Sequence, residues 1–308
     1  MPVALNPYEN IYVIRSASDL PDELDRYRIY HCLYDPGQGI GLYYSPDGLE
    51  LVPVSAIYDY ALEVSQGNVP GVSFVNKFGT NHDIGTAYEH VWEQEGFWVP
   101  MPVATLMEVA STDANDTAAG SGAQNLIIEG IGDDGLDLSD TVILDGQTPV
   151  LTNEIFAFVN RAYIGSAGST GYNEGDLYIA DDSTAWVAGV PQTAAAVQVD
   201  IHAEHGQTQQ CIYTVPADKT AYVTGGYISA DGTKVCTYRF FQTTRATVAD
   251  VIGVKRVAFE ATVTGGSFIK PFNPYVQVPS LSTITVDAKV SVGSAEVSAG
   301  LDIFLVDN

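Results

Sequence analysis

The sequence predicts a mainly β protein: an antiparallel, jelly-roll-like β-sandwich that follows a small N-terminal domain and an extended arm. From residue 104 onward, most segments alternate apolar and polar residues with period two, as in "AAVQVDIHAEHG". Turn signals such as "DGT" and "PADKT" separate these segments. More than ten short strands with no helical pattern between them favour an antiparallel sandwich over an α/β fold.

Residues 1–72 are expected to form a separate, small attachment domain. The stretch "SASDLPDELDRYRIY" predicts a short helix with Pro21 in its first turn. The stretch "IGLYYSPDGLELVPV" predicts a β-hairpin, because Pro46 and Gly48 suit a turn between two apolar runs. The glycine- and proline-rich segment "SQGNVPGVSF" follows and is the predicted linker.

Residues 73–103 are rich in aromatic side chains but show no regular periodicity, which indicates an extended arm or long loop. Burying one large aromatic side chain contributes roughly 1.5–3 kcal/mol, so a few of them suffice to hold an arm against a neighbour. The arm and the N-terminal domain are therefore expected to anchor the protein and to leave the jelly roll facing outward. The alternative is that these aromatics close the sandwich of their own chain. The expected partner-binding residues are Phe78, Tyr88, Trp92, Phe97 and Trp98.

Residues 104–308 supply the predicted strands of the sandwich. In chain order the predicted strands are "ATLMEVAS", "QNLIIEG", "DTVILDG", "IFAFVNRAYIG", "GDLYIA", "TAWVAG", "AAVQVDIHAEHG", "QCIYTVPA", "TAYVTGGYIS", "KVCTYRFFQTT", "KRVAFEATV", "STITVDAKVSV" and "EVSAGLDIFLVDN".

The charge balance restricts the possible partners. With 38 acidic and 13 basic residues, the chain has a net charge of -25, which repels phosphate and argues against direct nucleic-acid binding. No apolar run approaches the ~20 residues of a membrane span, and the first residues lack a signal-peptide pattern, so a protein made in a cytoplasm is expected. The three widely spaced cysteines, Cys32, Cys211 and Cys236, are expected to be buried free thiols.

The stretch "NDTAAGSGAQNLIIEGIGDDG" at residues 115–135 has the composition of a ligand-binding loop. It lacks the lysine of a phosphate-binding loop, and its aspartates do not follow the EF-hand spacing. We interpret it as two turns around one strand, whose glycines shape the turns. A looser calcium site within "GDDGLDLSD" stays open as an alternative.

No catalytic residue, cofactor or metal site is predicted. His202 and His205 are three residues apart, so on a strand they point to opposite faces. The other histidines, His31, His82 and His90, have no companion cluster in the sequence. No Gly-x-Ser-x-Gly motif is present. Glycoside hydrolysis needs two carboxylates, but with 38 acidic residues such a pair can always be nominated, so it is no evidence for that activity.

An ordered set of sequence blocks resembles a family of tailed-bacteriophage virion structural proteins over residues 72–230. These blocks are "VNKFGTNHDIGT", "VWEQEGFWV", "STDANDTAAGSGAQNLIIEGIGDDG", "DTVILDGQTPV", "FVNRAYIGSAGSTGYNEGDLYIA" and "YTVPADKTAYVTGGYIS". The resemblance implies β-strands and turns, a place in the virion, and no catalytic residues.

The expected function is that of a non-enzymatic structural protein on the exterior of a bacteriophage particle, of the capsid decoration, cement or head-fibre type. Its expected partners are other virion proteins and itself, as a homotrimer, with neither nucleic acid nor membrane. One alternative is a tail-fibre or receptor-binding module that recognises a host glycan, because flat aromatic rings stack on sugars. Another is a jelly-roll major capsid subunit.

Overall fold

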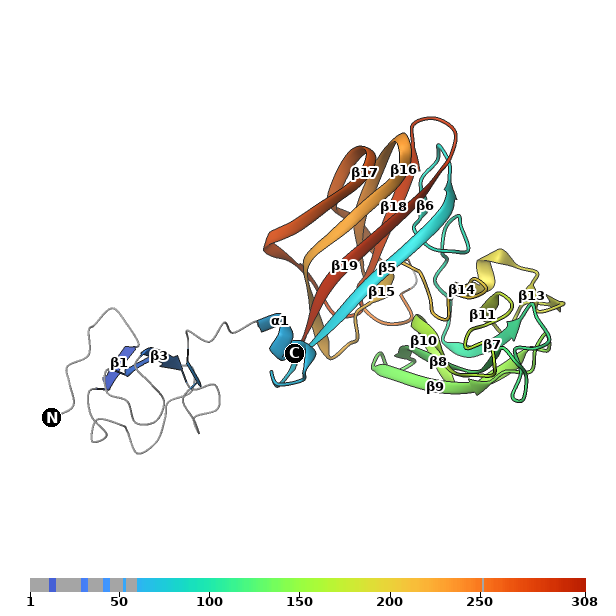
Figure 1. Ribbon diagram of the computed structural model, residues 1–308, viewed down its shortest axis with the longest axis horizontal. Helices are drawn as coiled ribbons and strands as arrows, with labels where there is room; N and C mark the ends of the chain where they lie inside the picture. The colour runs from blue at the N-terminus through green and yellow to red at the C-terminus, as the bar shows by residue number, and fades with distance from the viewer. Residues whose placement is uncertain (1–10, 15–28, 33–40, 45–51, 54–59, 251) are drawn as a thin grey trace. The chain divides into compact units, whose positions relative to one another are not determined.

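The computed structural model describes residues 11–14, 29–32, 41–44, 52–53, 60–250 and 252–308 (Figure 1). The chain divides into two compact units, Met1–Pro70 and Gly71–Asn308. The boundary between them falls inside the glycine- and proline-rich segment that the sequence predicts as a linker.

The first unit contains a small four-stranded sheet. Its first two strands are parallel and its other neighbours are antiparallel. The pairing of Tyr43 with Pro53 and of Tyr44 with Val52 confirms the predicted hairpin. The turn of that hairpin and the helix predicted around Pro21 lie outside the described residues. The elements are β1 (Ile11–Ile14), β2 (Ile29–Cys32), β3 (Gly41–Tyr44), β4 (Val52–Pro53) and the helix α1 (Tyr60–Ser65).

The second unit contains two large antiparallel sheets. The six-stranded sheet has the order β14-β11-β7-β10-β8-β9. One face of this sheet buries Met107, Leu126, Phe156 and Ile179 in a core of its own. Its strands are β7 (Thr105–Ser111), β8 (Ala123–Gly132), β9 (Asp137–Ile143), β10 (Val150–Ala167), β11 (Leu177–Asp181) and β14 (Val197–Ile201). Beside it lie β12 (Trp186–Val187), β13 (Val190–Pro191) and the 3-10 helix η2 (Ala194–Ala196).

The seven-stranded sheet is built around two very long strands. Its path is β15-β18-β16-β19-β5, with β17 paired to β16 and β6 paired to β18. Its strands are β5 (Val72–Ile84), β6 (Glu89–His90), β15 (Ile212–Thr214), β16 (Lys219–Thr244), β17 (Val254–Val278), β18 (Thr283–Val290) and β19 (Ala295–Asp307).

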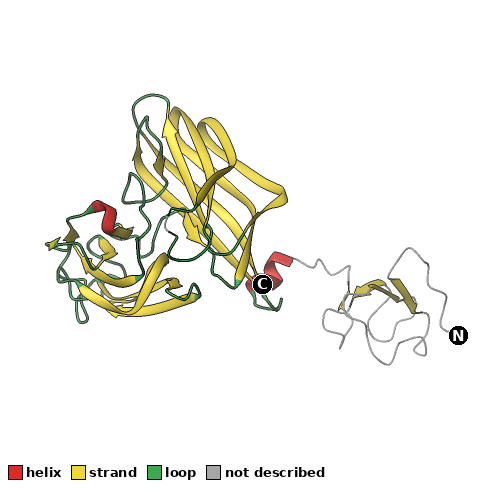
Figure 2. Ribbon diagram, turned by 180° about the vertical axis from the view of Figure 1, so that it is seen from behind, coloured by secondary structure: helices red, strands yellow, loops and turns green. Residues whose placement is uncertain are grey.

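Strand β16 makes this sheet curl into a sandwich. Up to Ala230 it pairs with β19, and from Cys236 onward it pairs with β18, while β17 follows both parts. The hydroxyl of Tyr238 donates a hydrogen bond to the carbonyl of Ser229, which ties the two parts of β16 together. The apolar side chains between the two halves form the largest core, including Val223, Phe240 and Ile303. The predicted class, a mainly β, antiparallel, jelly-roll-like sandwich, is therefore confirmed (Figure 2).

Residues 73–103 do not form a separate arm, contrary to the expectation. Most of the first half is β5, which pairs with β19 from Val72 to Ile84. The strand escaped detection because its inward positions Lys77, Gly79 and Asn81 are not apolar, so the period-two pattern is hidden.

The second half of β17, "GGSFIKPFNPYVQV", was also missed as a strand. Its prolines, Pro271 and Pro274, argue against a strand inside a sheet. They are tolerated because, among the described strands, β17 pairs with β16 alone and so on one side only. The two described cysteine side chains, Cys211 and Cys236, are buried free thiols, as predicted.

Candidate functional site

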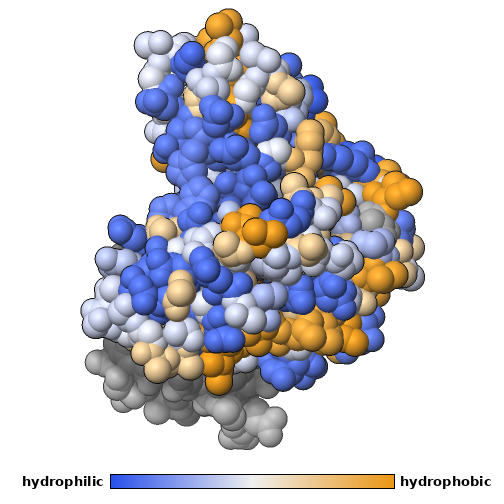
Figure 3. All heavy atoms as spheres, turned by 90° about the vertical axis from the view of Figure 1, so that its right-hand side faces the viewer, coloured by the Kyte–Doolittle hydropathy of each residue, from blue (hydrophilic) through white to orange (hydrophobic). Residues whose placement is uncertain are grey.

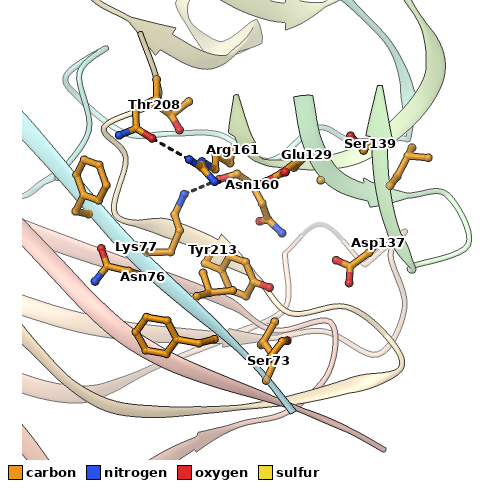
Figure 4. A pocket seen from close by; sticks show the side chains of 17 residues that line it. Ser73, Asn76, Lys77, Glu129, Asp137, Ser139, Asn160, Arg161, Thr208 and Tyr213 are labelled. Atoms are coloured by element: carbon orange, nitrogen blue, oxygen red, sulfur yellow. Dashed lines mark hydrogen bonds and ion pairs between the residues drawn. The ribbon is translucent and has the colours of Figure 1, made fainter. Parts of the chain in front are cut away.

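A cleft of about 730 Å³ opens inside the second unit, between the two sheets (Figure 4). Residues 73–78 of β5 form one wall, and residues of β8, β9 and β10 form the opposite wall. Gln207, Thr208, Tyr213 and Leu305 complete the lining. Polar side chains predominate on the wall contributed by the six-stranded sheet, including Glu129, Asp137 and Arg161.

Lys77 is the most unusual side chain in the cleft, because only 6% of it is exposed. Its Nζ donates a hydrogen bond to the backbone carbonyl of Asn160 at 2.5 Å (Figure 4). Burial lowers the pKa of Lys77 to about 8. The Asn160 amide is itself fixed, since it donates to the carbonyl of Thr214 at 2.9 Å and accepts from its N–H at 2.8 Å. One asparagine thus joins β10 to β15 and aims its carbonyl at the lysine.

Charged groups at the edge of the cleft are held by weaker contacts. Arg161 lies 4.0 Å from Glu129, and its Nη2 donates to the side-chain oxygen of Gln207 at 3.0 Å. Its guanidinium also lies 4.5 Å from the ring centre of Tyr163. About half of the Arg161 and Glu129 side chains is exposed, so both can turn toward a bound polar group.

Titratable groups in and beside the cleft have pKa values shifted by burial. Burial raises the pKa of Cys211, a neighbour of Lys77, to about 12, so its thiol stays protonated near neutral pH. Burial also raises the pKa of Asp137 and of Tyr213. These groups offer hydrogen bonds and charge to a polar ligand.

The five predicted partner-binding residues do not share one exposed surface. Trp92 and Trp98 are 2% and 5% exposed and pack in a core between the sheets of their own unit. Tyr88 is half-buried, with the Arg239 guanidinium 3.9 Å from its ring centre. Phe78 is half-buried in the cleft, and only Phe97 is mostly exposed. The two tryptophans thus pack inside their own chain, as the alternative expects.

The stretch at residues 115–135 is two turns around the strand β8, as interpreted from the sequence. Its buried residue Asp116 is the organising group. The Asp116 carboxylate accepts hydrogen bonds from the N–H groups of Ala123, Glu174 and Gly175. A Cβ on Gly122 would lie 2.1 Å from Asp116 Oδ1, so glycine is required there.

The structure brings three histidines together, which sequence reasoning missed. His82 stacks on His202 with 5.3 Å between ring centres, and His202 stacks on His205 at 5.8 Å. The argument that His202 and His205 point to opposite faces fails because β14 ends at Ile201 and both lie in the turn that follows. No sequence signal links His82 to them.

Comparisons with known proteins give no family for this chain. No family model matches, and no curated protein matches. Solved structures with some similarity include infectious bursal disease virus, Gt strain (11% identity, 77% of this chain and 73% of that chain covered, TM-score 0.22). Others are T=1 particles derived from the same virus (10%, 77% and 70%, 0.22) and the STIV MCP (10%, 75% and 97%, 0.20). At these TM-scores the likeness carries no argument.

Among the described residues, no helix has the length and apolar character needed to span a membrane.

Proposed function

We propose that this chain is a non-enzymatic structural subunit on the exterior of a bacteriophage particle, and that it acts by packing against copies of itself and other particle proteins. The ordered sequence blocks that resemble tailed-phage virion proteins support this proposal. The structural observation that carries it is the open edge of β17.

Strand β17 is 25 residues long and pairs with β16, and with no other strand in the part of the chain that the structure describes. A long open edge presents a row of backbone donors and acceptors to which another chain can add. Several large apolar side chains of this strand are also exposed, which favours contact with a partner over contact with water. They are Val254, Val257, Phe268, Ile269 and Tyr275.

The charge distribution favours packing through the same sheet. Residues 104–210, which include all the strands of the six-stranded sheet, hold 16 acidic residues and one basic residue, whereas residues 211–308 hold eight of each. Repulsion between copies is therefore concentrated on the six-stranded sheet and its loops, and the strands from β15 to β19 are neutral overall. Figure 3 shows the side of the molecule on which β13 lies in Figure 1: hydrophilic residues cover much of it, and hydrophobic residues form separate patches. This distribution suits a subunit that packs through β16 and β17 and turns its acidic sheet outward.

Quantitative mass spectrometry of purified particles tests the proposal. The protein is expected in a fixed ratio to the shell subunit and, in intact particles, open to surface labelling. A copy number equal to that of the shell subunit would instead indicate a major capsid subunit, and absence from the particles would refute the proposal.

Substitutions in β17 test the role of its edge. Ile269→Lys combined with Tyr275→Lys is expected to change the free energy of unfolding by no more than about 0.5 kcal/mol, because both side chains are exposed. The same double variant is expected to lose self-association and incorporation into particles. Ile143→Lys is the matched control, since Ile143 is 63% exposed on β9 at an edge of the other sheet. Equal losses in the double variant and the control would show that the β17 edge is not the interface.

The cleft favours a second candidate function, the binding of a host glycan by a tail-fibre or receptor-binding module. The cleft is lined by polar side chains and by the aromatic residues Phe78 and Tyr213. Side chains of both kinds occur in sites that bind sugars. A glycan array tests this candidate, with Arg161→Ala expected to remove any specific signal. Glycan binding unaffected by Arg161→Ala would place that function elsewhere on the chain.

A further inference from the structure

Four side chains from three distant chain segments meet next to the junction of the two sheets. His82 lies near the end of β5, Glu93 follows β6, and His202 and His205 follow β14. One potential ligand atom from each of His82, Glu93 and His202 can be chosen so that all three lie within 4.8 Å of one another. Two imidazoles and one carboxylate are a common donor set for transition metals.

The Glu93 carboxylate is the centre of this cluster, and its side chain is 0% exposed. One oxygen, Oε1, is hydrogen-bonded to Nδ1 of His205 and lies 4.0 Å from Nδ1 of His202. The other oxygen, Oε2, is buried without a hydrogen-bond partner. Burying a carboxylate oxygen without a partner is costly, and a cation bound to it would offset that cost.

Each of the two candidate histidine ligands has one ring nitrogen near a further carboxylate. His82 Nδ1 lies 3.2 Å from Glu296 Oε2, and His202 Nε2 lies 3.7 Å from Asp200 Oδ2. Metal-binding histidines commonly donate their second ring N–H to a carboxylate, as His82 can to Glu296, which fixes the tautomer and orients the ring. The 3.7 Å between His202 and Asp200 is too long for a hydrogen bond. The nitrogens that remain are Nε2 of His82 and Nδ1 of His202.

We propose that His82, Glu93 and His202 bind one divalent first-row transition metal ion of the Zn²⁺ type, with His205 orienting Glu93 through Oε1. Imidazole ligands suit Zn²⁺ and its neighbours and do not suit Ca²⁺ or Mg²⁺, which take oxygen ligands. Metal–ligand bonds of about 2.1 Å in a tetrahedral site place ligand atoms about 3.4 Å apart. Binding therefore requires the ligand atoms of the three side chains to move closer to one another by about 1 Å. The side chains of His82 and His202 are 36% and 34% exposed, which allows this rotation and leaves water access to a fourth position.

Such an ion would link the end of β5, in the seven-stranded sheet, to the turn after β14, in the six-stranded sheet. This inference replaces the expectation from the sequence that the chain has no metal site. It goes beyond the proposed function, since packing in a particle requires no metal.

Metal titration of the full chain after treatment with a chelator tests the proposal. Calorimetry with Zn²⁺ and the absorption spectrum of added Co²⁺ are expected to show one ion per chain, bound by nitrogen and oxygen ligands. His82→Ala and His202→Ala are each expected to weaken binding by tenfold or more, whereas His31→Gln, in strand β2 of the other unit, leaves it unchanged. Zn²⁺ is also expected to raise the melting temperature of the wild type but not of His82→Ala, whose partly exposed position tolerates the change.

Three results would overturn the proposal. The first is the absence of stoichiometric binding. The second is equal affinity in the wild type and in the folded His82→Ala and His202→Ala variants. The third is a melting temperature that responds to pH near 6 but not to Zn²⁺ or Co²⁺, which would identify the cluster as a proton-binding site.

Discussion

Lys77 is a buried ammonium group between two β-sheets, and it donates a hydrogen bond to the carbonyl of Asn160. Its charge is retained at neutral pH because its lowered pKa, about 8, still lies above 7. The protein therefore bears the cost of burying this charge at every pH below about 8.

The free energy of unfolding is expected to depend on pH because of this cost. In the unfolded chain Lys77 has its ordinary pKa of 10.5, so between pH 8 and pH 10.5 the unfolded state holds more protons and the Lys77 contribution rises with pH. The free energy of unfolding of the wild type, relative to that of Lys77→Met, is expected to increase by about 2 kcal/mol from pH 7.5 to pH 10. Urea unfolding at the two pH values measures the difference.

Lys234→Met is the control for the Lys77 comparison. Lys234 is only half-buried and donates to the carbonyl of Val292 at the edge of a turn. Its substitution is expected to leave the pH dependence of the wild type unchanged. The same pH slope for Lys77→Met and the wild type would show that Lys77 is not desolvated.

The two buried tryptophans give a second residue-scale prediction. Trp92→Ala and Trp98→Ala are each expected to lower the free energy of unfolding by about 3–5 kcal/mol, because each leaves a large cavity in the core between the sheets. Phe97→Ala, at a side chain that is 55% exposed, is expected to change it by about 0.5 kcal/mol at most. Chemical unfolding of the isolated protein measures all three. If the double variant Trp92→Ala, Trp98→Ala were fully stable, the result would support the hypothesis that these aromatics anchor the protein to a partner.

At the scale of elements, the corner where β16 and β17 fold over depends on two adjacent glycines of β17. Gly265 and Gly266 both have positive φ angles, 57° and 68°. A Cβ on Gly265 would lie 2.1 Å from the carbonyl oxygen of Gly232, whereas a Cβ on Gly266 would meet nothing within 4 Å.

The two positions form a matched pair for mutation. Gly266→Ala is expected to cost about 1 kcal/mol, the strain of placing a side chain at positive φ. Gly265→Ala is expected to cost more, because the backbone at the corner must also move away from Gly232. Thermal unfolding of both variants tests the order. Equal losses would show that the close approach to Gly232 carries no energetic weight.

The strands that the sequence predicts are those whose inward positions are apolar. "QNLIIEG" and "STITVDAKVSV" became β8 and β18 because Leu126 and Val286, among others, face a core. The period-two pattern does not predict β5, whose inward positions carry Lys77 and Asn81, or the proline-containing half of β17. It also failed for the histidine cluster, because contact between residues 82, 93 and 202 depends on how the sheets pack, and no local pattern records that.

At the scale of the whole molecule, the negative charge is distributed unevenly along the chain. The chain carries a net charge of -25, and residues 211–308 contribute none of it. If the proposed homotrimer forms through β17, its assembly brings the acidic sheets of different copies closer together and is opposed by their repulsion.

Salt is therefore expected to promote self-association. Raising the ionic strength from about 0.01 M to about 0.1 M shortens the Debye length from about 30 Å to about 10 Å and screens the repulsion between acidic sheets. Sedimentation velocity at the two ionic strengths is expected to show a larger trimer fraction at the higher one. A trimer that dissociates on adding salt would mean that ion pairs, and not apolar contacts, hold the copies together.

The order of strands along the chain has a consequence for synthesis of the protein. Strand β5 pairs with β19, the last strand, while all the strands of the six-stranded sheet lie between them in sequence. A ribosome adds about 5–20 residues per second, so the emerging β5 waits for roughly 10–40 s until its partner is made. During that time its edge can pair with the same strand of another nascent chain. A chain that ends at residue 294 never completes this pairing, and it is expected to aggregate in the cell although its six-stranded sheet is intact.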